Sequence, residues 1–278
     1  MVVGMITWGV SWPAAKVVGR YGDPNDLIVW RFVFALITML AVMKIFKIRL
    51  KFPQKSLKYV VAASVLIVFY NFNYLKGTQI GLSSLGGVIV PTLSPLFTYI
   101  LSILFLNKHV RTKEISGLFI GFIGGFFLIK AWEVNIESIV LSGNIYFLIG
   151  AILWSGVTIF TQKANKELHP INFSFWVYGI AMLIALPIFP LHSITAIFQY
   201  DLLFWYNFIL ISVIALGLGT TAYFITTMRL GSHKASSFMF IVPFSAVLSA
   251  SIFLGETIAI TTIIGGLFST AAVYLINK

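Results

Sequence analysis

The sequence predicts an all-α integral membrane protein with ten transmembrane helices, and three observations support this fold class. Hydrophobic residues make up 59% of the 278 residues and charged residues only 10%, with a mean hydropathy of +0.98, whereas a soluble domain carries about 25% charged residues. Apolar runs of about 20 residues, the length that crosses a bilayer, recur along the whole chain. These runs lack the alternation of a β-barrel, so we expect helices to satisfy the backbone in lipid.

The first five spans are separated by charged clusters and by Gly, Pro and Asn breaks. Asp23 and Pro24 follow the first run, and a basic loop at 44–58 separates the second run from the third. The third and fourth runs are joined by a very short loop, and the charged segment NKHVRTKE precedes the fifth. We expect these spans at 2–20, 26–46, 57–77, 82–106 and 114–130.

The second five spans are separated by the same kinds of residues. Lys163 and Lys166 end the sixth run, and Arg229 and Lys234 lie between the eighth run and the ninth. A very short loop joins the ninth run to the tenth. We expect these spans at 141–163, 171–192, 203–228, 234–254 and 258–277.

The charges are distributed unevenly between the two predicted sides of the membrane. One side receives 14 of the 19 basic residues: Lys44, Lys47, Arg49, Lys51, Lys55, Lys58, Lys108, Arg111, Lys113, Lys163, Lys166, Arg229, Lys234 and Lys278. The other side receives Arg20, Lys76 and Lys130 with most of the acids, namely Asp23, Asp26, Glu133, Glu137, Asp201 and Glu256. The positive-inside rule therefore predicts that both termini are cytoplasmic. The net charge of +11 follows from this topology, and we expect no nucleic-acid partner.

The beginning of the chain bears on targeting. The first run lacks the basic n-region of a cleavable signal peptide. It also begins abruptly inside apolar sequence, which is consistent with a missing short N-terminal tail.

The chain repeats itself, which predicts two domains at 1–132 and 140–278. At an offset of 146 residues, Trp8, Pro24 and Trp30 match Trp154, Pro170 and Trp176. At an offset of 148 residues, Pro95, Leu106 and Gly117 match Pro243, Leu254 and Gly265. Because five helices is an odd number, the second half enters the membrane from the opposite side. Two inverted five-helix repeats around a central cavity are typical of secondary transporters, which bind substrate between the repeats.

Four segments carry a family resemblance: WGVSWPAAK (8–16), WRF (30–32), TLSPLFTYILSILFL (92–106) and IVPFSAVLSASIFLGE (241–256). They resemble the EamA-type carriers of the drug/metabolite transporter superfamily. The family usually has a small residue followed by Glu after the fourth and ninth helices; here Gly255-Glu256 keeps that ending and Asn107-Lys108 departs from it. The resemblance implies a carrier of the bacterial inner membrane that exports amino acids or other small metabolites by alternating access. Nucleotide-sugar and sugar-phosphate carriers share the scaffold.

Two basic residues lie inside apolar spans and are candidates for binding substrate. Trp8, Trp12 and Lys16 recur every four residues, so they share one face of the first helix. Arg31 lies about one turn inside the second helix. Either cation attracts a carboxylate or phosphate if it faces the cavity, and the resemblance favours Lys16 for this role. The alternative for both is that the long side chain reaches the membrane interface, with Asp26 as a partner for Arg31.

Polar and aromatic side chains supply the other candidates. We expect the cavity to be framed by Trp12, Asn71, Asn73, Tyr74, Trp154, Thr158, Trp176 and Tyr223. Asn71 and Asn73 cannot point the same way on a helix, so at least one is expected to face inward. The alternative is that these groups only hold helices together. Pro91, Pro95 and Pro243 are expected hinges, with static kinks as the alternative.

These observations favour a secondary transporter over other classes, and the resemblance implies export. No Asp or Glu lies securely in mid-span, so amino acids or related zwitterionic and anionic solutes are favoured over organic cations. Proton coupling, exchange and facilitated diffusion stay open. A carrier of nucleotide-sugar, sugar-phosphate or drug-like solutes is the alternative. No catalytic or metal motif and no cysteine occurs, so we expect no enzyme activity and no cofactor. The expected partners are the solute and membrane lipid, and the protein is expected to be a monomer or homodimer.

Overall fold

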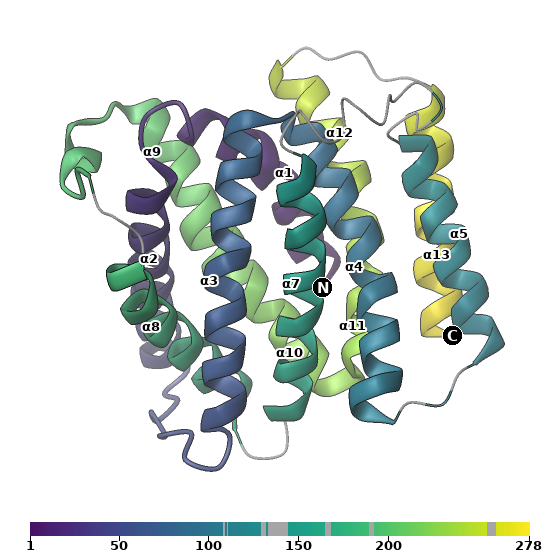
Figure 1. Ribbon diagram of the computed structural model, residues 1–278, viewed down its shortest axis with the longest axis horizontal. Helices are drawn as coiled ribbons and strands as arrows, with labels where there is room; N and C mark the ends of the chain where they lie inside the picture. Colours follow the sequence, from purple (N-terminus) through teal and green to yellow (C-terminus); the bar gives the residue numbers. More distant parts are fainter. Residues whose placement is uncertain are drawn as a thin grey trace.

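A computed structural model describes residues 1–107, 109, 111–128, 132, 144–164, 168–188, 192–254 and 260–278. These residues form a bundle of helices without a β-strand (Figure 1). Lys108, Lys130, Glu133, Glu137, Lys166 and the Gly255-Glu256 pair lie outside the described residues. The predicted all-α class is confirmed.

The helices follow the predicted order of spans. The first five are α1 (Val2–Val18), α2 (Pro24–Ile45), α3 (Leu57–Ile80), α4 (Ser83–Leu106) and α5 (Thr112–Leu128). The next two are α7 (Asn144–Ala164) and α8 (Pro170–Ile188), and a short 3-10 helix, η1 (Ala196–Gln199), follows them. Six described helical stretches are long and apolar enough to cross a membrane, among them Pro24–Ile45 and Leu202–Leu230, and shorter apolar helices include α1.

The last three spans are less regular. The eighth consists of α9 (Leu202–Ile209), a π-helix η2 (Leu210–Thr220) and α10 (Thr221–Leu230). The ninth consists of α11 (Ser232–Ser237), a 3-10 segment η3 (Phe238–Phe240) and α12 (Ile241–Leu254), and the tenth is α13 (Ile260–Asn277). Pro243 therefore lies in the first turn of α12, directly after a break, and not in the middle of a continuous helix. Proline is tolerated in the first turn of a helix, where its fixed φ suits the helical backbone and its missing N–H costs least.

Local chemistry explains where several helices begin. The carboxylate of Asp23 accepts a hydrogen bond from the Asn25 amide at 2.8 Å, and Pro24 occupies the first helical position of α2. Asp201 caps α9 in the same way by accepting from the Phe204 amide at 2.9 Å. Both caps satisfy amides that would otherwise lack a partner at a helix N-terminus.

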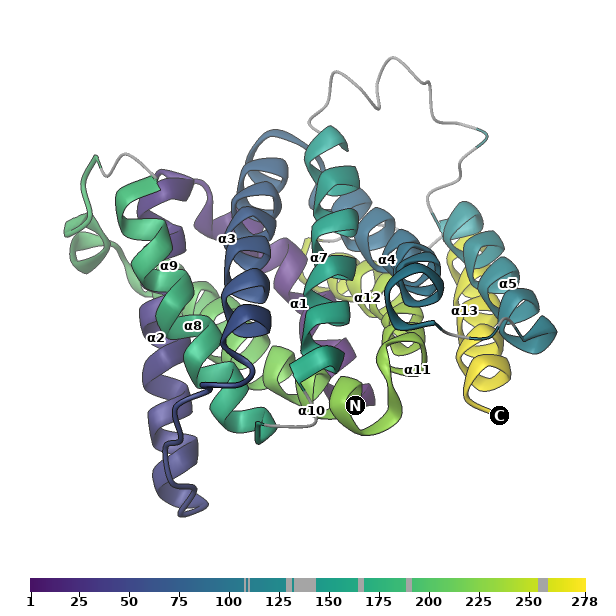
Figure 2. The ribbon, with the colours of Figure 1, turned by 60° about the horizontal axis from the view of Figure 1, so that its bottom comes forward.

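The packing places α5 and α13 together at one edge of the bundle and α2 with α8 at the other (Figures 1 and 2). Between these edges, α7 packs on α3 and α4, while α1 packs on η2 and α12. Exchanging the two predicted repeats converts the first of these sets into the second, as an inverted repeat requires. The boundaries at 132 and 140 stay a prediction.

Small residues bring α5 and α13 into close contact. A Cβ placed on Gly124 would lie 2.9 Å from the Gly265 carbonyl oxygen, and one on Gly117 would lie 2.6 Å from Ile276 Cγ1. Glycines at such positions let membrane helices approach closely. This glycine face is therefore used within the chain.

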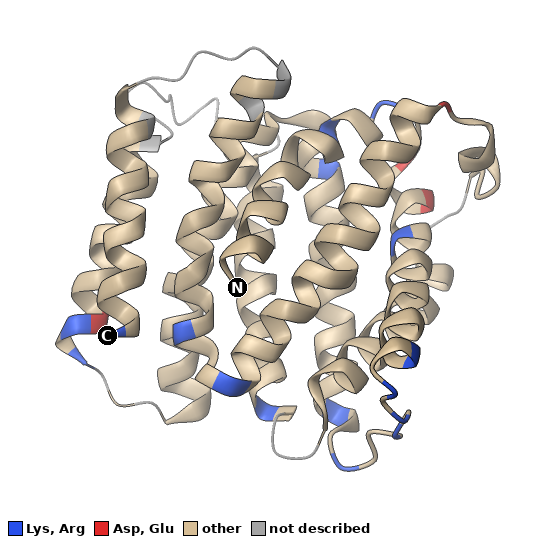
Figure 3. Cartoon of the chain, turned by 180° about the vertical axis from the view of Figure 1, so that it is seen from behind, with Lys and Arg blue, Asp and Glu red and all other residues tan. Residues whose placement is uncertain are grey.

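Lys and Arg gather mainly at one end of the bundle, whereas the other end carries acidic residues together with a few basic ones (Figure 3). We call the end where α2 and α4 finish the basic end, because Lys44, Lys47 and Arg49 lie there. We call the opposite end, which holds Asp23, Asp26 and Asp201, the acidic end. Glu114 is an exception, since it lies in the first turn of α5 at the basic end.

Candidate functional site

A small cavity of about 30 Å³ lies at the centre of the bundle and is lined by residues from both predicted repeats. Its lining residues are Trp8, Ser11, Trp12, Arg31, Tyr70, Asn71, Tyr74, Val90, Pro91, Trp154, Ala215, Leu216, Thr220, Met239 and Val242. Several of these side chains, including Trp12 and Trp154, are almost completely buried. The cavity is therefore lined by side chains from the interior of the bundle.

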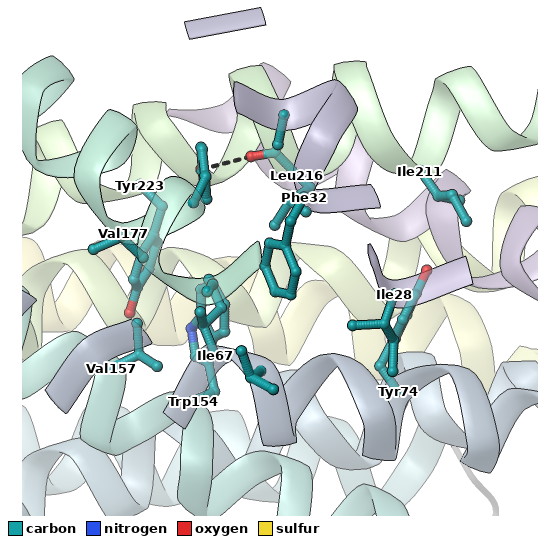
Figure 4. Close-up of a cluster of buried hydrophobic side chains, with 14 of the residues drawn as sticks. Ile28, Phe32, Ile67, Tyr74, Trp154, Val157, Val177, Ile211, Leu216 and Tyr223 are labelled. Carbon is teal, nitrogen blue, oxygen red and sulfur yellow. Dashed lines mark hydrogen bonds between the residues drawn. The ribbon is translucent and has the colours of Figure 1, made fainter. Parts of the chain in front are cut away.

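Aromatic rings form much of the wall. Trp8 and Trp154, which are equivalent in the predicted repeat, meet edge to face with ring centroids 4.9 Å apart. Trp12 packs against Tyr74 at 4.7 Å, and Tyr70 packs against Trp154 at 4.8 Å. Figure 4 shows Trp154 beside Tyr223, with Tyr74 further along the same core. This wall suits an apolar group or a cation placed over a ring face.

Arg31 is the only basic residue among those that line this described cavity. Its side chain is 4% exposed, its Nη2 donates to the Ile211 carbonyl at 3.0 Å, and its guanidinium carbon lies 4.8 Å from the centre of the Tyr74 ring. Its Nε and Nη1 have no hydrogen-bond partner. A buried cation with unpaired donors is costly. The arrangement therefore favours an anion that enters the cavity.

Asp26 is not the partner that the sequence suggested for Arg31. Its two carboxylate oxygens accept from the backbone amides of His192 at 3.2 Å and Ser193 at 3.0 Å. The carboxylate thus holds the loop after α8 against α2. Neither of these hydrogen bonds involves Arg31.

Asn71 gives the cavity a second polar group. It is fully buried, and its Nδ2 donates to the Ile67 carbonyl at 2.7 Å, while its Oδ1 has no partner. Asn73 makes the same bond to the Phe69 carbonyl but does not line the cavity. The structure therefore turns one of the two predicted asparagines inward.

Lys16 occupies a position that neither interpretation of the sequence foresaw. Its Nζ donates to the carbonyl oxygens of Gln79 at 3.1 Å and Gly81 at 2.8 Å, where α3 turns into α4. Gln79 in turn donates from Nε2 to the Gly19 carbonyl at 3.0 Å. Lys16 thus ties α1 to the α3–α4 turn and does not line the cavity.

Three other predicted residues also lie outside the cavity. Thr158 and Tyr223 share a hydrogen bond of 2.8 Å, and the Tyr223 ring packs against Trp154. Trp176 lies near the basic end, where its Nε1 donates to the Lys51 carbonyl at 2.8 Å. Its repeat mate Trp30 does the same at the acidic end, donating to the Ile194 carbonyl at 2.6 Å. This tryptophan pair anchors loops rather than framing the cavity.

The π-helix η2 supplies wall residues that sequence reasoning missed, namely Ala215 and Leu216. Three side chains from other helices donate to its carbonyls: Arg31 to Ile211, Trp8 to Ala215 at 3.1 Å and Tyr178 to Leu216 at 2.8 Å. Neighbouring groups of this kind satisfy a backbone that departs from the α-helix in a membrane. An apolar run such as LISVIALGLGT carries no sign of this departure, so its inward face could not be assigned.

The comparisons with known proteins agree with this architecture. The sequence model of the EamA-like transporter family matches residues 1–130 and 141–278. The chain is 26% identical to the uncharacterized transporter YvbV of Bacillus subtilis, over 98% of this chain and 88% of that protein. It is 23% identical to an uncharacterized transporter of Archaeoglobus fulgidus, over 98% of this chain and 95% of that one.

One solved crystal structure shares the fold, with a TM-score of 0.73 at 14% identity over 99% of this chain and 94% of that chain. The relatives are named as transporters and not as enzymes. The family match covers nearly the whole length. The chain therefore belongs to the EamA-like transporter family, and it is a membrane transporter of small solutes.

Proposed function

We propose that the protein is a secondary transporter that exports small metabolites bearing a carboxylate, most of all amino acids and related zwitterionic or anionic solutes. The observation that carries the proposal is Arg31, a buried guanidinium with two unpartnered nitrogens in the central cavity. Guanidinium groups bind carboxylates through paired, charge-assisted hydrogen bonds. The rest of the solute would lie against the rings of Trp8, Tyr70 and Trp154.

The composition of the wall argues against organic cations as substrates. No Asp or Glu occurs among the described residues that line the cavity. A cationic solute would meet Arg31 without a counter-charge, which is unfavourable inside a membrane. The wall therefore supports a solute that brings its own negative charge.

Alternating access requires the cavity to open toward each end of the bundle in turn. Lys16 holds the α3–α4 turn at the acidic end. At the basic end, the Ser232 amide donates to Gln162 Oε1 at 2.5 Å, and the Ser232 hydroxyl shares a 2.8 Å bond with Ser102. Under the positive-inside rule the basic end faces the cytoplasm of a bacterial cell, with both termini on that side. The hinges would be Pro91, Pro95 and Pro243.

The test is counterflow in proteoliposomes that contain purified protein and a panel of labelled amino acids, organic acids, phosphate esters and amines. Wild type should take up carboxylate solutes saturably, and Arg31→Leu should raise their apparent KM about 30-fold or more, for a loss of about 2 kcal/mol. Arg31→Leu should unfold at the same temperature as wild type or higher, because it removes a buried charge with unpaired donors.

Arg20→Leu is the matched control, since Arg20 is exposed at the end of α1 and should transport normally. Normal carboxylate transport by Arg31→Leu would contradict the proposal. Preferential uptake of amines would contradict it as well. If only phosphate esters were taken up, the protein would still be a carrier, but its substrates would belong to the sugar-phosphate class.

A further inference from the structure

Four buried polar atoms of the described lining residues have no partner: the donors Nε and Nη1 of Arg31 and Nε1 of Trp154, and a single acceptor, Oδ1 of Asn71. The residue is fully buried, so water at the protein surface does not satisfy it. A buried carbonyl oxygen without a hydrogen bond is rare in native proteins and calls for an explanation. An occupant of the cavity that carries a donor would supply one.

The chemistry of the side chain fixes which amide atom is free. The Ile67 carbonyl can only accept, so the atom 2.7 Å from it must be the amide nitrogen. The remaining atom is the oxygen, which accepts and cannot donate. The free group is therefore an acceptor, whereas the free nitrogens of Arg31 are donors.

The unpartnered atoms of Arg31 and Asn71 would bind opposite kinds of hydrogen-bonding group on a solute. Arg31 offers donors and a positive charge to an acid, and Asn71 offers an acceptor to a donor group. We infer that Asn71 is a specificity-determining residue that makes the cavity prefer acids with a hydrogen-bond donor beside the carboxylate, an ammonium above all. This inference rests on the carboxylate transport proposed above. The nearby rings of Trp8, Tyr70 and Trp154 add to the preference, because a cation is attracted to an aromatic face.

Acids with the same side chain but different groups at the 2-position should therefore bind with different affinities. A 2-amino acid supplies a charged donor to Asn71, and the matching 2-hydroxy acid supplies a neutral one. The 2-oxo acid presents an oxygen to the Asn71 oxygen, so both acceptors stay unpaired. Each step down this series should weaken binding, and the whole series should span about tenfold or more in apparent affinity.

The experiment measures how well four solutes with the same side chain compete for counterflow: the amino acid, the hydroxy acid, the oxo acid and the amine without a carboxylate. Wild type should rank them in that order. Asn71→Leu should bring both the amino acid and the hydroxy acid down toward the level of the oxo acid and leave the oxo acid unchanged. Asn71→Ala, which also removes the acceptor, should act in the same direction and replaces the leucine variant if that variant does not fold.

Asn73→Leu is the matched control. It removes the same side chain and the same kind of bond, here to the Phe69 carbonyl, two positions away and outside the cavity. Its competition ratios should equal those of wild type.

The outcomes separate this inference from the proposed function. Equal competition by the three acids in wild type, or unchanged ratios in Asn71→Leu, would overturn the role of Asn71 and keep carboxylate transport. Failure of every acid to compete would overturn both. An equal change of ratios in Asn73→Leu would make the effect one of helix packing and would also overturn the inference.

Discussion

Two helix pairs that the predicted repeat makes equivalent differ in the regularity of their backbones. In the first pair, α3 and α4 are continuous α-helices, although α4 contains Pro91 and Pro95. In the second pair, the eighth span contains the π-helix η2 and the ninth contains the 3-10 segment η3. Equivalent positions in the two halves thus do not share local structure. We expect the second pair to be the one that changes shape more during transport.

The short connections within the two helix pairs also differ in the side chains that hold them. The connection between α3 and α4 is held mainly by the ammonium group of Lys16, which donates to two carbonyls. The connection between α10 and α11 is held by the hydrogen bonds of Ser232 to Gln162 and Ser102. In addition, Nε2 of the next residue, His233, lies 3.3 Å from Glu114 Oε1. Removing single contacts should therefore affect the two ends of the cavity unequally.

The largest difference is expected at the two glycines that end the third and eighth spans. Gly231 has φ 90° and ψ 158°, a conformation that side-chain residues avoid, whereas Gly81 has φ −93°, which any residue adopts. A Cβ on Gly231 would meet only ordinary contacts, the nearest at 3.5 Å. The cost of Gly231→Ala therefore comes from the backbone and should be about 1–3 kcal/mol.

Thermal unfolding in detergent measures this difference. Gly231→Ala should lower the unfolding temperature clearly, while Gly81→Ala should leave it nearly unchanged. Equal losses in both variants would mean that the two turns are under the same constraint.

The next effect concerns the ends of the cavity. The chain has no cysteine, so Ser11→Cys places a single thiol in the cavity wall. Adding Lys16→Met removes two charge-assisted bonds worth about 1.5 kcal/mol and should raise thiol labelling from the acidic end about tenfold. Adding Gln162→Leu should raise labelling from the basic end by less, because Ser102 and Glu114 still hold that turn.

Membrane-impermeant maleimides applied to oriented vesicles distinguish the two ends. Labelling of the parent Ser11→Cys protein gives the baseline. Increased labelling from the wrong end in either variant would contradict the assignment of that contact to that end.

The spans were predictable because charges, prolines and glycines interrupt apolar sequence wherever a loop must lie. Arg31 and Asn71 were also identifiable as candidates, since a polar group in such a run needs a reason. The direction of a side chain was not predictable, because it depends on the neighbouring helix. Lys16 reaches the carbonyls that end α3, and Trp176 reaches a loop of the other repeat. The predicted repeat pairs Trp30 with Trp176 but gives no indication that both anchor loops.

A smaller effect is expected from the prolines. Pro243→Ala restores an N–H after η3 that can donate to the Met239 carbonyl, which would favour a straight ninth span by about 1 kcal/mol, or about fivefold in population. Transport should slow by about that factor while the unfolding temperature holds or rises. Pro95→Ala should slow transport less, because α4 is already continuous. Normal counterflow by both variants would mean that neither proline acts as a hinge.

The smallest effect is expected where the irregular pair begins. Asp201 caps α9, whereas Ser56 at the start of α3 makes no side-chain cap bond. The Phe204 amide and the Tyr21 hydroxyl donate to the Asp201 carboxylate, which holds its pKa below the ordinary 3.8. A carboxylate whose pKa is lower in the folded state stabilises the fold fully above 3.8 and loses that contribution as the pH falls through the lower value.

Asp201→Ala should therefore lower the unfolding temperature slightly at pH 7, and the gap to wild type should close at a pH below 3.8. Ser56→Ala should show no gap at either pH, because its side chain makes no cap bond. A gap for Asp201→Ala that stays constant down to acid pH would show that the side chain acts by packing. In that case the charge of the Asp201 cap would not be the reason why the start of the eighth span differs in stability from the start of the third.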